Sequence, residues 1–456
     1  MNQKFRLLLS GMFLLMFLKG TAQVPSDTIP SGSEKGKEKI KKGWNLGPLP
    51  ILGYNSDIGL QFGALVSLYN YGDGSWYPKY FHQFYAEASW TTKGGGIYQF
   101  FYDSERLLRP VRVTANVTYL TERALDFYGF NGYRAVVSKD WTDDEDSAAY
   151  VTRVFYRHER KLLRIGVDFQ GKFLVDHLRW TAGFTFMDFI TGPVDIERLN
   201  KGKKESKQLP DTAGLYQRYC EWNILEEKER DGGMNNHIRL GLIWDTRDNE
   251  PNPMRGIWSE IMLLGAPGFI GDNDYSFLRL AVTHRQYFTL VRDQLSFVYR
   301  LGYMGTIAGK TPFYFLPYMI NSYSLTTTID GLGGSLTLRG VRRNRVVGDG
   351  VAFANAEFRW KFLKFRFIRQ NWYLAVNVFG DAGMVVQQRP VDRSGIPDTV
   401  NQGAYFSNEP EVPHIGVGGG LRLAMNQNFI IAVDLGQPID RRDGSFNVYV
   451  GLGYLF

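Results

Sequence analysis

The sequence predicts an all-β chain that closes into a sixteen-stranded antiparallel transmembrane β-barrel with long extracellular loops. From Gly47 onward, successive segments alternate apolar and polar side chains with a period of two, as strands between lipid and an aqueous lumen do. After Ala22 no run of about 18 apolar residues occurs, which excludes a helical membrane protein. Aromatic residues make up 15% of the chain and glycines number 50, a composition that favours strands over Leu- and Ala-rich helices.

The N-terminus has the three parts of a secretory signal peptide. Lys4 and Arg6 precede an apolar run over Leu7–Leu18, and Gly20-Thr21-Ala22 offers a small-residue cleavage site. The alternative, a transmembrane anchor, needs about 20 apolar residues, and this run is too short. We therefore expect a signal peptide over 1–22 and export to the outer membrane of a Gram-negative bacterium. The polar, Lys-rich residues 23–46 cannot bury a core and predict a flexible periplasmic stub before a barrel domain over 47–456.

The C-terminal segment Phe446–Phe456 shows the alternation clearly. One face carries apolar side chains, namely Phe446, Val448, Val450, Leu452, Tyr454 and Phe456. The other carries smaller or more polar ones, namely Asn447, Tyr449, Gly451, Gly453 and Leu455. We expect a closing strand that ends at Phe456, with Leu452, Tyr454 and Phe456 as a C-terminal barrel signal on the lipid face.

Charged residues elsewhere fall on the face expected to line the lumen. Glu357 and Arg359 alternate with Phe358 and Trp360, and Asp381 lies in register with Tyr373 and Asn377. Asp434 lies between Val433 and Leu435, and Arg279 and Arg285 oppose Leu278, Leu280 and Val282. On the lipid face, charges would cost roughly 2–4 kcal/mol each at mid-depth. The alternation therefore assigns them to the inner wall.

Sixteen segments satisfy this pattern, an even number that places both ends of the barrel in the periplasm. They are Leu49–Tyr54, Leu60–Tyr69, Tyr80–Thr92, Gly96–Arg106, Val111–Thr121, Tyr150–Leu174, Leu178–Ile190, His237–Thr246, Gly256–Leu264, Ser276–Leu290, Leu295–Ile307, Val351–Phe367, Trp372–Val386, Ile415–Met425, Phe429–Gln437 and Phe446–Phe456. Short connections such as Val291–Asp293 predict periplasmic turns, and the long ones over 125–149, 191–236, 308–350 and 387–413 predict extracellular loops. Cys220, the single cysteine, lies in one of these loops, so no internal disulfide framework is expected.

Four short motifs resemble the BamA/TamA-type outer-membrane barrel superfamily, also called the bacterial surface antigen family. Leu338-Arg339-Gly340-Val341 is similar to the family's (V/L)RG(F/Y) motif. Asp245-Thr246-Arg247-Asp248-Asn249, followed by Pro253 and Gly256, resembles its DxRDN…P…G turn. Phe379-Gly380-Asp381-Ala382-Gly383 is similar to its F-x-D-x-G strand, and Glu357 stands at its strand-borne acidic position. The resemblance covers essentially all of residues 47–456.

The resemblance implies that the sixth extracellular loop folds back into the lumen. Its Arg339, next to Gly340, would then contact Glu357 and Asp381, which the alternation independently assigns to the inner wall. A guanidinium is a planar fork that two carboxylates can hold with charge-assisted hydrogen bonds. The alternative is that all three side chains line a wet lumen, separately solvated. The motifs therefore predict a luminal loop anchor.

The family's assembly and translocation members carry periplasmic POTRA modules before the barrel, and the short segment between Ala22 and the first strand leaves no room for one. We therefore expect a family member without POTRA modules that works in outer-membrane protein assembly, insertion or translocation. Its expected partners are outer-membrane lipids, client proteins or other assembly subunits. Glycines near both ends of the barrel sequence, Gly47, Gly53, Gly451 and Gly453, suggest a weakly packed seam between the first and last strands.

The alternative function is a passive porin-like channel or a structural subunit of a larger outer-membrane complex. There the luminal loop would be a constriction, and inner charges such as Arg279, Arg300 and Arg422 would set selectivity. Steady conductance in planar bilayers would favour the channel. Loss of function on locking the first strand to the last would favour the seam.

Catalysis and cofactors are not expected. None of the six histidines lies in a G-x-S-x-G elbow or an H-x-x-x-H metal pattern. The glycines of Gly416–Gly420 precede a strand rather than a helix, so they predict room for an inserted loop instead of a phosphate site. A net charge of +7, spread along the chain, does not indicate nucleic acid. We expect no enzyme, no metal and no cofactor.

Overall fold

The computed structural model describes residues 40–77, 79–145, 148–250, 252–271, 275–322, 330–367, 370–425 and 429–456. The predicted signal peptide and most of the predicted stub lie outside these residues. The first strand begins at Trp44, slightly before the predicted start of the barrel domain at Gly47.

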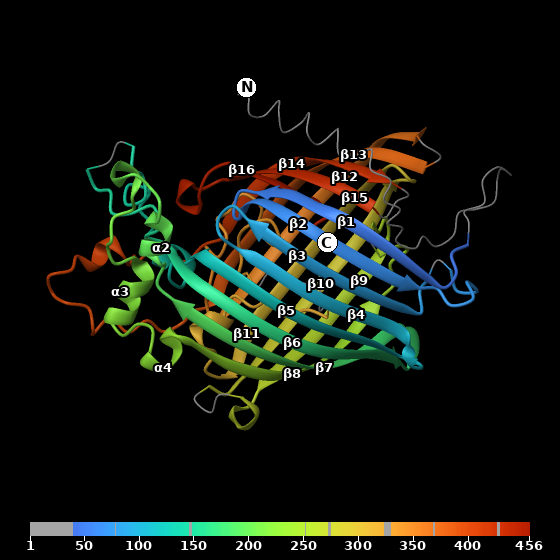
Figure 1. Cartoon of the computed structure of the whole chain (residues 1–456), viewed down its shortest axis with the longest axis horizontal. Helices are drawn as coiled ribbons and strands as arrows, with labels where there is room; N and C mark the ends of the chain where they lie inside the picture. The colour runs from blue at the N-terminus through green and yellow to red at the C-terminus, as the bar shows by residue number, and fades with distance from the viewer. Residues whose placement is uncertain are drawn as a thin grey trace.

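Sixteen antiparallel strands form one closed barrel in which each strand pairs with its sequence neighbours and β1 pairs with β16 (Figure 1). The strands are β1 (Trp44–Asn55), β2 (Gly59–Asn70), β3 (His82–Thr91), β4 (Gly96–Leu108), β5 (Val111–Asp126), β6 (Arg157–Phe173), β7 (Val175–Gly192), β8 (Gly232–Asp245), β9 (Gly256–Ala266), β10 (Phe277–Val291), β11 (Leu295–Gly309), β12 (Gly350–Phe367), β13 (Gln370–Gln387), β14 (His414–Met425), β15 (Phe429–Pro438) and β16 (Asn447–Leu452). The predicted fold class and strand number are confirmed.

The alternation places side chains as predicted. On β12, Phe358 and Trp360 are exposed on the outer face, whereas Glu357 and Arg359 are buried on the inner face. On β13, Val378 is exposed and Asn377 is buried. Because one face of the sheet meets lipid and the other meets the lumen, the period of two decides which strand residues lie on each face.

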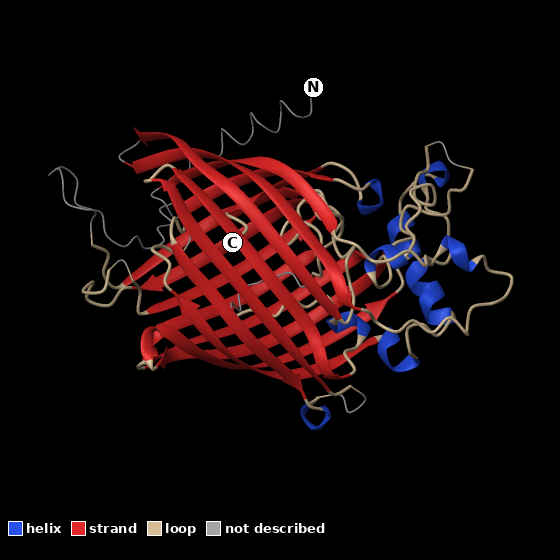
Figure 2. Ribbon diagram, turned by 180° about the vertical axis from the view of Figure 1, so that it is seen from behind, coloured by secondary structure: helices blue, strands red, loops and turns tan. Residues whose placement is uncertain are grey.

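The two ends of the barrel differ. At one end, called here the turn end, strands are joined by connections as short as the single residue Leu174 between β6 and β7. At the other, the cap end, the connections carry the short helices of the described residues (Figure 2). The helices are α2 (Ile196–Asn200), α3 (Leu215–Glu221) and α4 (Glu227–Arg230), with 3-10 turns at η2 (Gly132–Arg134), η3 (Glu205–Lys207), η4 (Gly268–Ile270), η5 (Phe313–Phe315), η6 (Gln402–Ala404) and η7 (Arg441–Asp443). Among the described residues, none of these helices has the length and apolar character that a membrane crossing requires.

The long connections over 127–156, 193–231 and 388–413 pack together into a folded unit, called here the loop cap. Its core is aromatic and includes Phe127, Phe155, Tyr219, Trp222 and Phe406, all buried. Arg389 donates two hydrogen bonds to the carboxylate of Glu229, at 2.8 and 3.0 Å, and so ties two of the connections together. Cys220 packs against this core, and burial raises the pKa of its thiol to about 11. Cys220 is therefore a packing residue of the loop cap.

The predicted strand over Tyr150–Leu174 is wrong at its start. β6 begins at Arg157, and Phe155 and Tyr156 belong to the loop cap. The apolar pattern of this segment arises from the aromatic core of the cap and not from a lipid face. The sequence pattern alone does not distinguish apolar residues packed in the cap from apolar residues that face lipid.

The C-terminal prediction is also wrong in part. β16 ends at Leu452, which is exposed on the outer face as expected. Gly453 has a φ of +81°, and after it the chain turns into the barrel. Tyr454 lies beside the guanidinium of Arg359, 4.2 Å from ring centroid to Cζ, and Phe456 packs against Tyr287 and Val298 of the inner wall. Tyr454 and Phe456 therefore do not face lipid, because a glycine in the left-handed region breaks the strand between them and Leu452.

Candidate functional site

The connection between β11 and β12 enters the barrel. Its residues 330–349, called here the luminal loop, include four side chains with no exposed surface, namely Leu332, Leu338, Val341 and Val346. A backbone bridge joins Leu332 to Val346, so the loop folds on itself as a narrow hairpin. Its tip carries the Leu338–Val341 motif that the sequence singled out.

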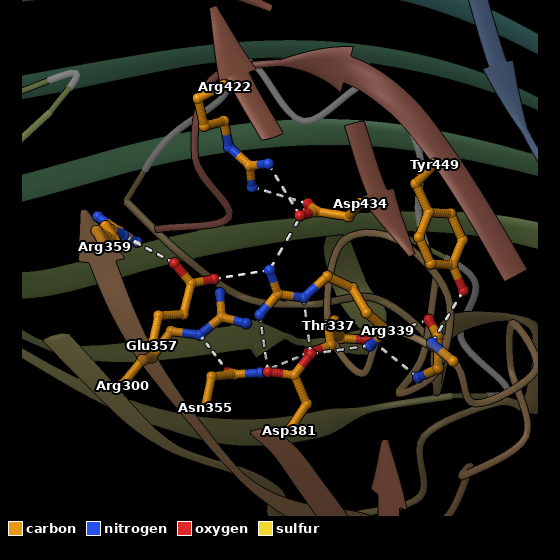
Figure 3. Close-up of polar contacts among 12 residues, drawn as sticks. Arg300, Thr337, Arg339, Asn355, Glu357, Arg359, Asp381, Arg422, Asp434 and Tyr449 are labelled. Atoms are coloured by element: carbon orange, nitrogen blue, oxygen red, sulfur yellow. Dashed lines mark hydrogen bonds and ion pairs between the residues drawn. The ribbon is translucent and has the colours of Figure 1, made fainter. Parts of the chain in front are cut away.

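Arg339 lies at the tip and reaches two strands of the wall (Figure 3). Its Nε donates to Oδ2 of Asp381 at 2.8 Å and its Nη2 donates to Oδ1 at 3.0 Å, a bidentate contact. The backbone N–H of Arg339 donates to the same carboxylate at 3.0 Å. Nη1 forms an ion pair with Oε1 of Glu357 at 2.7 Å. The structure therefore brings Arg339, Gly340, Glu357 and Asp381 together.

Neighbouring charges complete this arrangement into a cluster, called here the anchor cluster. Arg422 pairs bidentately with Asp434 at 2.8 and 2.9 Å, and Asp434 also lies 3.6 Å from Nη1 of Arg339. Arg359 donates to Glu357 at 2.7 Å. Three guanidinium groups (Arg339, Arg359 and Arg422) thus meet three carboxylates (Glu357, Asp381 and Asp434), so each charge of this set has an opposite charge beside it.

Electrostatics keeps Arg339 charged despite its burial. Desolvation alone would lower the pKa of the guanidinium, but the carboxylates of Glu357 and Asp381 outweigh that cost and raise it. The guanidinium carbon also lies 3.5 Å from the ring centroid of Phe379, a cation–π contact that fills its remaining face. A buried charge is stable only when it is paired and hydrogen-bonded in this way.

Glycines on the wall and in the loop let the two backbones touch. A Cβ on Gly416 of β14 would lie 2.0 Å from the carbonyl oxygen of Arg339, and a Cβ on Gly436 of β15 would lie 2.7 Å from the backbone nitrogen of Gly340. Gly340 itself has a φ of +95°, which a side chain would strain. Its N–H donates to the hydroxyl of Tyr449 at 3.1 Å. Gly416 therefore makes room for the inserted loop, as its sequence context predicted.

Four further contributors were missed as site residues. Alternation assigned Arg359, Asp434 and Tyr449 to the inner wall, and Arg422 was named only as a selectivity charge. Their contacts with the loop or its partners depend on which strands lie opposite the loop tip, and strand order supplies that information only once the barrel is closed.

The predicted turn motif lies elsewhere. Arg247 follows β8 at the turn end and donates from Nε to Asp245 at 3.0 Å, while its guanidinium stacks 4.2 Å from the Trp258 ring. Asp248 accepts backbone N–H groups of Met254 and Arg255 at 3.0 and 3.3 Å. These residues hold the β8–β9 connection and contribute nothing to the anchor cluster.

The second notable feature is the seam between β1 and β16. Twelve residues of β1 have a registered partner on β2. Of the described residues of β16, only Val450 and Tyr449 are registered partners of β1, opposite Tyr54 and Asn55. Because the chain turns inward at Gly453, β1 from Trp44 to Gly53 has no strand partner on this side among the described residues. The barrel closes through the cap-end part of its seam alone.

Asp57 lies between the seam and the luminal loop, and its raised pKa predicts that the stability of the seated loop depends on pH. It lies in the β1–β2 turn, and a Cβ on Gly334 of the luminal loop would be 2.7 Å from its Oδ2. Burial, and then the nearby charge of Asp126, raise the pKa of Asp57 to about 7, with Arg343 opposing. A carboxyl whose pKa is higher in the folded state stabilises that state below its unfolded pKa, and the contribution is lost as pH rises through about 7.

We therefore expect protease resistance of the luminal loop to fall between about pH 4 and pH 7, measured by limited proteolysis of detergent-solubilised protein. Asp57→Asn should remove this pH dependence. Asp73→Asn, in an exposed turn at the opposite end of the barrel, should retain it. An unchanged pH profile in Asp57→Asn would contradict the role of this carboxyl.

The fold is similar to those of two solved structures. The crystal structure of BamA from Haemophilus ducreyi lacking POTRA domains 1–3 has a TM-score of 0.52 at 13% identity, covering 91% of this chain and 71% of that chain. CdiB from Escherichia coli has a TM-score of 0.54 at 9% identity, covering 91% of this chain and 64% of that chain. At these identities the likeness concerns the fold alone, and this chain spans less than two thirds of the CdiB chain.

No curated protein sequence matches the chain. In the part of the chain that the structure describes, no group of three or more His, Cys, Asp or Glu is placed to hold a metal ion. A family model described as the Omp85 superfamily domain matches residues 83–456, most of the barrel and all of the anchor cluster. This chain is a member of the Omp85 superfamily.

Proposed function

We propose that this protein is an outer-membrane barrel that works in the assembly, insertion or translocation of outer-membrane components, and that the β1–β16 seam is its working site. The cap end would face the cell exterior and the turn end the periplasm. Its partners would be outer-membrane lipids and client molecules. The proposed role needs no catalytic residue, cofactor or nucleic acid.

The observation that carries the proposal is the short pairing at the seam. In hydrocarbon, backbone polar groups must find partners, so closed barrels ordinarily pair every strand along its length. Here two registered pairs and the contacts of Ser56 with Val448 hold β1 to β16. The N–H and hydroxyl of Ser56 donate to the Val448 carbonyl at 3.1 and 3.2 Å, and the Val448 N–H donates to the Ser56 hydroxyl at 2.9 Å. Since each hydrogen bond contributes roughly 0.5–1.5 kcal/mol, opening the seam costs only a few kcal/mol. A wall with one weak junction suits lateral passage between lumen and membrane.

The luminal loop and the loop cap speak against the alternative of a passive channel. A porin needs a continuous aqueous path, whereas here the luminal loop contacts β12 to β16 inside the barrel. The cap lies at one end of the barrel (Figure 2), and its core is aromatic. The anchor cluster would hold the luminal loop as a fixed internal support for the wall beside the seam. Tyr449 of β16 binds Gly340 of that loop, so the support includes the seam strand itself.

The test is a disulfide across the seam, made in a Cys220→Ser background. Gly53 and Gly451 follow the registered pairs in the same register, and a Cβ on either has no neighbour closer than 3.4 Å. We expect Gly53→Cys with Gly451→Cys to abolish complementation of a depleted host strain, measured by quantitative proteomics and lipid analysis of the outer membrane. Reduction of the disulfide should restore function.

The matched control places a disulfide on the other side of β1. Leu46 and Leu68 are registered partners of β1 and β2, both on the outer face. Leu46→Cys with Leu68→Cys should leave function intact, because this junction is already paired along its whole length. Full activity of the oxidised Gly53/Gly451 variant would refute the seam as the working site.

A further inference from the structure

The backbone register shows which groups of β1 face the open part of the seam. In a strand, the N–H and C=O of successive residues point to alternate neighbours. Ser56 donates its N–H to Val448 of β16, whereas Gly43 donates to Gly72, beyond the end of β2. Even-numbered residues of β1 therefore present their backbone groups to the seam, and odd-numbered residues present theirs to β2.

Two of the seam-facing residues are prolines. The even-numbered positions between the start of β1 and the registered pairs are Trp44, Leu46, Pro48, Pro50 and Leu52. Pro48 and Pro50 carry no N–H, so no donor faces the seam between Leu46 and Leu52, a length of about 20 Å at 3.3 Å per residue. Proline is tolerated in sheets where its imide nitrogen faces an unpaired edge, and there it prevents the addition of another strand.

The inner face of β1 is apolar beside these prolines. Its lumen-facing residues in this segment are Gly47, Leu49, Ile51 and Gly53, and Leu65 of β2 is the registered partner of Leu49. One strand further, the corresponding face of β3 carries Gln83, Tyr85 and Glu87. Elsewhere the inner wall bears charges, as at the anchor cluster. Between Leu46 and Leu52, β1 thus presents apolar side chains to both lipid and lumen, and its seam-facing edge offers carbonyl groups but no N–H donor.

We propose that the open part of the seam admits the acyl chain of a membrane lipid and does not accept a client β-strand by pairing with β1. This inference rests on the proposed function of the seam and names its substrate class. An acyl chain brings no backbone polar group of its own into the seam and gains from apolar contact on both faces of β1. The carbonyls of β1 that face the open part of the seam have no strand partner among the described residues, with or without this chain. An incoming strand would instead bury carbonyl groups opposite Pro48 and Pro50 with no donor, at a cost of several kcal/mol each in hydrocarbon.

The first experiment places the full chain in nanodiscs that contain phosphatidylethanolamine with a diazirine on one acyl chain, followed by photolysis and peptide mapping. Labelling is expected on the lumen-facing residues Leu49 and Ile51 as well as on the outward-facing Leu46 and Leu52. Thr185, on the inner face of the fully paired strand β7, should remain unlabelled in the same sample. Labelling of β1 confined to its outward-facing residues would overturn the proposal.

The second experiment tests strand exclusion with a biotinylated benzophenone peptide that copies β2 (Gly59–Asn70). Wild type should capture little peptide, and Pro48→Ala with Pro50→Ala, which restores two seam-facing donors, should capture at least about fivefold more, since two new hydrogen bonds are available. Leu49→Ala with Ile51→Ala is the matched control, because the donors of these residues face β2. Equal capture by wild type and the proline variant would overturn strand exclusion.

The outcomes separate this inference from the proposed function. If the seam disulfide leaves complementation intact while Leu49 and Ile51 are labelled, lipid enters the seam but the seam is not the working site. If the disulfide abolishes function while the inner face stays unlabelled, the seam works and its substrate is not an acyl chain.

Discussion

Replacing Arg339 with alanine is expected to release the luminal loop from the wall. The substitution leaves Asp381 buried without its bidentate partner and takes from Glu357 one of its two guanidinium partners, and loss of one member of a buried ion pair costs about 3–5 kcal/mol. The seated state of the loop should weaken by more than about a hundredfold, at 1.4 kcal/mol per factor of ten. We expect rapid proteolysis within residues 330–349 and reduced heat resistance of the folded band on seminative gels.

Two companion variants give this prediction its specificity. Arg339→Lys keeps the charge but loses the bidentate fork to Asp381, so it should recover only part of the resistance. Arg292→Ala removes an arginine from an exposed turn and should behave as wild type. Wild-type proteolysis and gel mobility in Arg339→Ala would show that the anchor cluster does not hold the loop.

Replacing Gly416 with leucine is expected to expel the luminal loop by steric means, with every charge of the anchor cluster left in place. The first side-chain carbon would already lie 2.0 Å from the Arg339 carbonyl oxygen, which is backbone and cannot move aside alone. Overpacking typically costs 1–3 kcal/mol, and a clash with backbone places this variant at or above the upper end. Loop proteolysis should resemble that of Arg339→Ala.

Gly380 supplies the matched control on the next strand. It is one residue before Asp381, faces outward, and a Cβ there would meet no atom within 4 Å. Gly380→Leu adds the same side chain on the lipid face and should leave both stability and proteolysis unchanged. If Gly380→Leu and Gly416→Leu had equal effects, the cost would come from strand propensity and not from the seated loop.

Which strand residues face the lumen could be predicted from the sequence, because the alternation with a period of two assigns each of them to one face of the wall. Glu357, Asp381 and Asp434 were placed inside by alternation alone, since lipid excludes them from the other face. Tyr454 and Phe456 could not be placed, because the turn at Gly453 depends on a pocket formed by Arg359, Tyr287 and Val298 on distant strands. Phe155 and Tyr156 were wrongly predicted as strand residues for a similar reason, because apolar residues packed in the core of the cap show the same sequence pattern as residues that face lipid.

The anchor cluster was only partly predictable. The motif resemblance linked Arg339 to Glu357 and Asp381, and the structure brings these three together. Pairing of Arg422 with Asp434 and of Gly340 with Tyr449 needs the closed strand order, in which β14, β15 and β16 face the loop tip. The prolines of β1 are plain in the sequence, but their meaning depends on which neighbour each amide faces, and only the register reveals that.

The burial of the ion pairs around Arg339 has a consequence for the response of this barrel to salt. Dissolved ions weaken an exposed ion pair because they gather around each of its charges. Arg339, Glu357 and Asp381 are almost wholly out of contact with solvent, so dissolved ions screen their attraction far less. The luminal loop should therefore keep one position across ionic strengths that would rearrange an ordinary surface contact.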